Sequence, residues 1–323
     1  MEIRNFATSL RVDPLEEEHP LCRDKMKNKD DKKAILYVSV TVLSWSTVAS
    51  AFKLALSSLT YYELLLISSI TALIAFAIVL TFRKRWFLLR SVSRRQWRMF
   101  ALAGTLNPAI YYLVLFKSYE LLPAQIAQPI NYMWPVVLSL MLAVFARQRI
   151  PAVKFVGMTI SLAGVAVISI GPGQLTGTNL SALGIALGIG SAFVWATYWL
   201  INRMNAETDP IVSLFLNFFF GTIELLMIAP FMKIEISSLQ GVLAAVYSGL
   251  FEMTIPFICF GIALKKTNNP ALINHLCYLS PFLSLFIIHL ILGESIYPTT
   301  YTGLALIVGG LLFNEYIGIR YSS

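Results

Sequence analysis

Apolar segments of about 20 residues recur along this chain from Ala34 to the C-terminal end. A helix of that length crosses the hydrocarbon core of a bilayer, which is roughly 30 Å thick. Of the 323 residues, 57% are hydrophobic and 13% are charged, which is unlike the composition of a soluble protein. Lipid offers no hydrogen-bond partners to the backbone, so such segments must be helical. The chain is therefore expected to be an all-α integral membrane protein.

The distribution of basic residues supports a count of ten spans. If the N-terminus is cytoplasmic, 22 of the 25 Lys and Arg residues fall on that side, and only Lys53, Lys117 and Lys233 fall on the other. This is the bias expected of helical membrane proteins. We predict a multi-pass protein of the cell inner membrane with both termini cytoplasmic. The predicted spans are residues 34–52, 62–82, 98–117, 124–145, 152–170, 182–202, 211–232, 239–264, 271–291 and 298–318.

The first 33 residues differ from the rest of the chain. They are polar, carry both signs of charge and contain no apolar core of the kind that a signal peptide needs. We expect residues 1–33 to be a mobile cytoplasmic tail. The net charge of +8 would suggest a nucleic-acid partner for a soluble protein, but here the basic residues flank apolar segments. No nucleic-acid partner is predicted.

An internal repeat divides the apolar part of the chain into two halves, residues 34–170 and 182–318. An offset of 146 residues places "NYMWPVVLSL" against "CYLSPFLSLF". Because each half has five predicted spans, the second half must run through the membrane upside down relative to the first. Inverted repeats of this kind are typical of secondary transporters, whose substrate sites lie near the bilayer midplane between the halves. The residues that match at this offset are Tyr132 and Tyr278, Pro135 and Pro281, Gly157 and Gly303, and Gly164 and Gly310.

The third and eighth predicted spans are both expected to be broken. "GTLNPAIYYL" places Asn107 and Pro108 shortly after a glycine, and "GLFEMTIPFI" places Glu252 and Pro256 at corresponding positions. Proline interrupts helical hydrogen bonding, and the freed backbone groups are tolerated in a membrane only beside protein or a water-filled cavity. Two ordinary proline kinks are the alternative interpretation.

Polar and aromatic residues within the spans are the candidates for a binding cavity. In "PINYMWP", Asn131 and Pro135 would share one face of a continuous helix, and Tyr132 would lie beside them. Tyr132 and Trp134 could instead anchor the helix at lipid headgroups, and Trp134 would point away from Asn131. Glu252 is the candidate for coupling, because an ionisable group inside a span marks a functional site by default. The predicted substrate-binding residues are Trp45, Asn107, Tyr111, Asn131, Tyr132, Trp195, Tyr198, Glu252, His275 and Tyr278.

With this repeat, residues 34–316 resemble the drug/metabolite transporter superfamily with its tandem EamA-type domains. The closer likeness is to aromatic amino acid exporters of the YddG type, through "LSWST" at 43–47, "NYMWP" at 131–135 and "FVWATYWLINRMN" at 193–205. The resemblance implies an inner-membrane carrier that exports amino acids by alternating access, with its cavity between the two halves. Aromatic walls also suit aromatic or other hydrophobic solutes and amino groups.

Other functions stay open at this point. The same fold could carry another metabolite, such as S-adenosylmethionine or a nucleoside, and a membrane channel is the alternative from another class. No clustered nucleophile, acid/base pair or Cys/His metal spacing is visible, so we expect neither an enzyme nor a cofactor. The sequence has no GxxxxGK[ST] motif, so protons are a possible coupling partner. We expect the carrier to act as a monomer on a small-molecule substrate within the lipid bilayer.

The predicted topology can be tested by labelling. A single cysteine at Asn179, between the fifth and sixth spans, should react with an impermeant thiol reagent added to intact cells. A single cysteine at Ser322 should stay unlabelled, because we place the C-terminus in the cytoplasm. Labelling of Ser322→Cys from outside would overturn the ten-span count.

Overall fold

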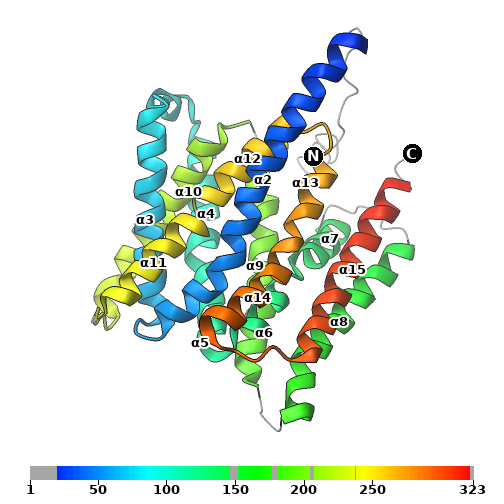
Figure 1. Ribbon diagram of the computed structural model, residues 1–323. Coiled ribbons are helices and arrows are strands. Elements are labelled where there is room, and N and C mark those ends of the chain that lie inside the picture. The colour runs from blue at the N-terminus through cyan, green and yellow to red at the C-terminus, as the bar shows by residue number, and fades with distance from the viewer. Residues whose placement is uncertain (1–19, 146–151, 177–179, 204–206, 237, 321–323) are drawn as a thin grey trace.

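The computed structural model describes residues 20–145, 152–176, 180–203, 207–236 and 238–320. The regular structure in these residues is helical, as predicted (Figure 1). Its elements are α2 (Pro20–Leu56), α3 (Tyr61–Phe82), η1 (Trp86–Ser91), α4 (Arg94–Gly104), η2 (Thr105–Ile110), α5 (Tyr111–Leu121), α6 (Ala124–Asn131), α7 (Trp134–Phe145), α8 (Ala152–Thr176), α9 (Ala182–Arg203), α10 (Pro210–Ile228), η3 (Ala229–Phe231), α11 (Leu239–Phe251), α12 (Ile255–Lys266), α13 (Pro270–Cys277), α14 (Leu279–Leu292) and α15 (Pro298–Arg320).

Seven helical segments within the described residues are long and apolar enough to cross a membrane. They are Asp31–Leu56, Tyr61–Phe82, Arg94–Leu121, Ala182–Asn202, Pro210–Phe231, Leu239–Lys266 and Leu272–Leu292. A shorter apolar helix, Val153–Ser169, lies within α8. The protein is thus a multi-pass, all-helical membrane protein, while the count of ten spans stays a prediction.

We name the two ends of the helical bundle by where α2 begins and α15 ends. Figure 1 shows that α2 begins and α15 ends at the same end of the bundle, which we call the terminus end. The other is the far end. Helix α2 begins at Pro20 and so includes residues 20–33, which were expected to belong to a mobile tail; residues 1–19, Asn179 and Ser322 lie outside the described residues.

Helices α8 and α15 pack side by side through the glycines that match in the repeat (Figure 1). A Cβ atom added to Gly164 would lie 2.5 Å from the carbonyl oxygen of Gly303, and Gly157 meets Gly310 in the same way. The two helices therefore run antiparallel. Ser161 donates a hydrogen bond to the carbonyl of Ile307 at 3.0 Å, and these two positions are also 146 residues apart. The contacts thus have the pattern of a two-fold axis between the halves.

Each half inserts its first helix into the other half. Helix α2 packs against α11, α12 and α14, whereas α9 packs against α5, α6 and α7. Trp45 of α2 and Trp195 of α9 occupy matching places in these crossed packings, 150 residues apart in sequence. The exchange brings side chains of both halves to a common centre.

The two "YxxP" sequences mark helix interruptions, which corrects the expectation of one continuous helix over residues 124–145. Helix α6 ends at Asn131 and α7 begins at Trp134, and likewise α13 ends at Cys277 and α14 begins at Leu279. A proline ring clashes with the carbonyl four residues earlier, so Pro135 and Pro281 end the preceding turn there. Asn131 and Pro135 therefore belong to two separate helices.

The predicted breaks in the third and eighth spans are present. Asn107 has non-helical backbone angles (φ −142°, ψ 115°) within the π-helical turn η2, and its peptide bond to Pro108 is cis. In the other half, α11 ends at Phe251 and α12 begins only at Ile255. The two breaks lie at matching places in the halves.

The close packing of α8 on α15 yields a stability prediction. Gly164→Ala would place a methyl group against the backbone of α15, so we expect it to lower the free energy of unfolding by about 1–3 kcal/mol. Gly309→Ala, on α15, is the matched control, because a Cβ there meets nothing within 4 Å. Thermal unfolding in detergent should show a lower midpoint for Gly164→Ala than for Gly309→Ala. Equal midpoints would show that this packing does not hold the halves together.

Candidate functional site

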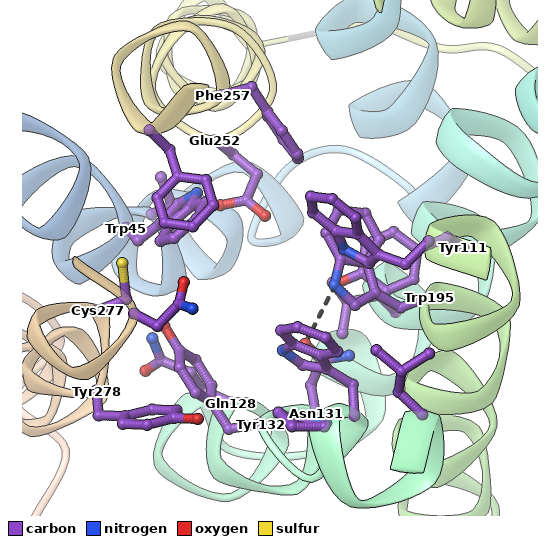
Figure 2. A pocket seen from close by; sticks show the side chains of 18 of the residues that line it. Trp45, Tyr111, Gln128, Asn131, Tyr132, Trp195, Glu252, Phe257, Cys277 and Tyr278 are labelled. Atoms are coloured by element: carbon purple, nitrogen blue, oxygen red, sulfur yellow. Dashed lines mark hydrogen bonds between the residues drawn. The ribbon is translucent and has the colours of Figure 1, made fainter. Parts of the chain in front are cut away.

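A cavity of about 460 Å³ lies where the two halves meet, and it draws its walls from both (Figure 2). It is lined by Trp45, Val48, Phe52, Tyr111, Leu115, Tyr119, Gln128, Asn131, Tyr132, Trp134, Pro135, Leu138, Trp195, Trp199, Glu252, Phe257, Phe260, Leu264, Asn274, Cys277, Tyr278 and Glu315. Three of the four helix breaks contribute residues to the cavity wall. A helix can be interrupted in a membrane beside such a cavity.

Aromatic pairs on opposite walls follow the repeat. The ring of Trp45 lies 6.2 Å from that of Phe257, and the ring of Trp195 lies 4.5 Å from that of Tyr111. Phe257 is 146 residues after Tyr111, so the two pairs are counterparts. Trp195 also contacts Phe257, with ring centroids 5.8 Å apart, and so links the two walls. The result is a cavity whose flat faces come from both halves.

Two polar residues of the cavity, Asn131 and Glu252, sit at helix breaks. Figure 2 shows the carboxyl group of Glu252 pointing into the cavity, and it accepts a hydrogen bond from the hydroxyl of Tyr112 at 3.2 Å. Asn131 accepts a hydrogen bond from the Tyr111 hydroxyl at 3.2 Å and donates one to Ser191 at 2.8 Å. These bonds hold the polar tips in fixed places between the aromatic faces.

The charged groups of the cavity are acidic. Glu252 and Glu315 line it, and no Lys or Arg is among its lining residues in the described part of the chain. Glu315 lies 2.7 Å from His275 Nε2, so α15 and α13 are linked beside the cavity. An amino group or another cation would be attracted by this set, whereas a phosphate would find no positive partner.

Two buried polar atoms of the cavity wall have no partner within the described residues. They are Oε1 of Gln128 and Nε1 of Trp199. A buried polar atom without a hydrogen bond costs about 1–3 kcal/mol, so such atoms indicate a place for a polar ligand or water. One atom accepts and the other donates a hydrogen bond, which would suit a solute with both kinds of group.

Polar contacts close the bundle at the far end. Lys53 donates hydrogen bonds to the carbonyls of Tyr119 and Leu122 at 2.9 and 3.1 Å. Glu294, after α14, accepts a hydrogen bond from the first backbone amide of α6 at 3.2 Å, and Gln125 donates one to the carbonyl of Ser295 at 2.9 Å. We call these contacts of Lys53, Gln125 and Glu294 the far-end latch. In contrast, the cavity reaches toward the terminus end, where exposed Asn274 lines it.

Most predicted site residues come together at the cavity, and three do not. Trp45, Tyr111, Asn131, Tyr132, Trp195, Glu252 and Tyr278 line it. Asn107 and Tyr198 are buried behind the wall, and His275 contacts the lining residue Glu315 rather than the cavity. The substrate-binding role of all ten stays a prediction.

The sequence analysis missed some of the wall. Phe257 and Phe260 were not selected, although the 146-residue offset from Tyr111 indicates Phe257. Trp134 was expected to point away from Asn131, yet both line the cavity, because the break after Asn131 turns the chain. Glu315 lies near the C-terminal end of α15, and no local motif marks it.

The described residues contain no group of three or more His, Cys, Asp or Glu side chains that could hold a metal ion. The donors gathered at the cavity are instead two carboxylates, amides and aromatic groups. This set suits an organic solute.

Comparisons with known proteins agree with this architecture. A transporter of Clostridium kluyveri, described as uncharacterized, is 29% identical over 175 residues, which cover 52% of this chain and 56% of that protein. The uncharacterized transporter YvbV of Bacillus subtilis is 24% identical over 88% of this chain and 92% of its own. A protein of Streptantibioticus cattleyicolor named "Probable terminal-alkyne amino-acid exporter" is 24% identical over 87% of this chain and 92% of its own.

A solved structure, described only as a crystal structure of a protein, matches 90% of this chain and 99% of its own chain with a TM-score of 0.63. Its sequence identity is 21%, so this likeness concerns the fold alone. The model of the EamA-like transporter family matches residues 32–170 and again residues 182–316, one match in each half. The protein therefore belongs to the EamA-like transporter family, with two EamA repeats in one chain.

Proposed function

We propose that this protein is a secondary carrier of the inner membrane that exports amino acids, aromatic or otherwise hydrophobic, by alternating access. The observation that carries the proposal is the cavity between the repeats, where a carboxyl group is surrounded by aromatic faces and no basic residue lines the wall. In the proposed architecture, ten spans form two inverted five-helix repeats, with both termini in the cytoplasm. The resemblance of the motifs at 43–47, 131–135 and 193–205 to aromatic amino acid exporters of the YddG type supports the choice of cargo.

The cavity chemistry matches the parts of such a solute. Glu252 would pair with the ammonium group, and the rings of Trp45 and Trp195 would add cation–π attraction and stack on an aromatic side chain. The free indole N–H of Trp199 would donate a hydrogen bond to the carboxylate. A zwitterion thus finds a partner for each end without a basic residue in the wall.

The closed far end supports a carrier over a channel. A carrier must never be open at both ends, and here the far-end latch joins α6 of one repeat to the segment after α14 of the other. If the terminus end is cytoplasmic, the cavity faces the compartment from which an exporter loads. The relative that is named as an amino-acid exporter supports this direction.

A second cargo fits the same wall. A cation with a flat base, such as S-adenosylmethionine, would also pair with Glu252 and stack on the aromatic faces, as would an uncharged nucleoside through stacking and amide hydrogen bonds. The two acidic lining residues favour the cation among these. Competition between labelled phenylalanine and either compound would separate the candidates.

The cargo can be tested in proteoliposomes. We expect saturable uptake of labelled phenylalanine or tryptophan, and Trp195→Ala should raise the half-saturating concentration by roughly 2- to 12-fold, the equivalent of one aromatic contact of about 0.5–1.5 kcal/mol. Asn131→Ala and Tyr132→Ala should act in the same direction without loss of folded protein. Trp86→Ala is the matched control, because Trp86 lies outside the cavity in η1. Unchanged transport in all three cavity variants would remove the cavity from consideration.

The role of Glu252 can be tested with an imposed pH gradient. If Glu252 carries protons between the two faces, the gradient should accelerate the wild-type protein and leave Glu252→Gln unaffected. Gln keeps the size and the hydrogen bond with Tyr112 but does not titrate. Should both proteins respond alike, or neither respond, Glu252 is not the coupling group.

A further inference from the structure

The two broken helices carry polar residues at matching positions, yet these residues have different surroundings. Asn107 and Glu252 each follow a glycine by three residues and lie 145 residues apart. The glycines are packed alike: a Cβ on Gly104 would lie 2.5 Å from the carbonyl of Asn217, and a Cβ on Gly249 would lie 2.5 Å from the carbonyl of Ser68. The scaffold around the breaks is therefore symmetric.

The polar side chains break this symmetry. Glu252 points into the cavity, whereas Asn107 is fully buried and its side chain meets the hydroxyl of Tyr198. The same difference is found between matching residues of α2 and α9, the first helices of the two halves. Val48 of α2 lines the cavity, and Tyr198 of α9, 150 residues later, is buried behind it.

Asn107 belongs to a closed polar cluster behind the Trp195 wall, because its side chain meets the hydroxyl of Tyr198. The amide of Asn217 donates hydrogen bonds to the hydroxyl of Tyr198 at 3.1 Å and to Oδ1 of Asn202 at 3.4 Å, while its own Oδ1 has no partner within the described residues. Tyr198 stands against the ring of Trp195, with centroids 5.4 Å apart. One layer of aromatic rings therefore separates the cluster from the cavity.

A buried polar atom without a hydrogen bond, such as Oδ1 of Asn217, marks a place for water or for a polar group of a solute. In a carrier built from inverted repeats, the opposite-facing state forms when one repeat moves against the other around the site. If each half then adopts the arrangement that the other half has here, the Asn107 cluster becomes exposed and Glu252 becomes enclosed.

We propose that Asn107, Tyr198 and Asn217 form a second half-site, closed in this structure, that opens to the cavity when the carrier faces the far end. It offers amide and hydroxyl groups without charge, so it takes water or an uncharged polar group of the solute. This inference rests on the alternating access proposed above. A cationic group would then meet the carboxylate of Glu252 when the cavity faces the terminus end and the neutral groups of this half-site when it faces the far end, which favours loading in the first state and release in the second.

The accessibility of introduced cysteines tests whether the Asn107 cluster and Glu252 exchange their exposure. The test does not require the cargo to be known. In full-length protein with Cys22, Cys259 and Cys277 replaced, an impermeant thiol reagent is added to each face of the membrane in turn. Asn107→Cys should react at least tenfold faster from the far end than from the terminus end, and Glu252→Cys should show the opposite preference.

Three controls define the outcome. Exposed Ser57→Cys and Ser91→Cys mark the far and terminus faces, and buried Ser161→Cys, at the α8–α15 contact, should react from neither. Asn217→Cys serves as a second position if Asn107→Cys does not purify as a folded protein. Labelling of the cluster from neither face, or from the terminus end as fast as Glu252→Cys, would overturn the second half-site.

The proposed amino-acid cargo and the proposed exchange of exposure between the two half-sites can be rejected independently of each other. Absence of amino-acid uptake together with the expected labelling would reject the cargo and keep the second half-site. Normal uptake with an unreactive cluster would reject the second half-site and keep the carrier.

Discussion

A helix can be interrupted inside a membrane only where protein or water satisfies the backbone groups that the interruption frees. The described part of this chain has four such interruptions, at Asn107, Tyr132, Glu252 and Tyr278, and they occur as two matching pairs. Three of them border the cavity, and the fourth borders the closed cluster behind it. The position of the breaks therefore determines where polar chemistry exists in an otherwise apolar bundle.

The rest of the structure holds these breaks in register. Glycines allow α8 and α15 to approach along their length, and each half inserts its first helix into the other. Polar contacts join the halves at both ends: Gln125 and Glu294 of the far-end latch at one, and the ion pair of Arg85 with Asp209 at the other. In the alternating access proposed above, the α8–α15 contact would stay in place while the polar contacts at the two ends form and break in turn.

Much of this architecture could be predicted from the sequence, because its causes are local. Proline and glycine positions gave the repeat and the breaks of the third and eighth predicted spans. The interruptions at Tyr132 and Tyr278 were not expected, because residues 124–145 were predicted to form one continuous helix. The selection of cavity residues was less complete, because which side of a broken helix faces the cavity depends on packing. Asn107 and Glu252 have the same local signal, yet only Glu252 lines the cavity. Phe260 and Glu315 reach the site through helix placement that no motif encodes.

The central claim is that the cavity between the repeats holds an amino acid, and photolabelling tests it most directly. A diazirine analogue of phenylalanine is irradiated with the purified, full-length protein, and the adducts are mapped by mass spectrometry. The account predicts adducts on cavity residues such as Trp45, Trp195 and Phe257, which excess phenylalanine suppresses. Adducts confined to exposed apolar positions such as Phe286 or Met227, or adducts that excess phenylalanine does not reduce, would contradict it.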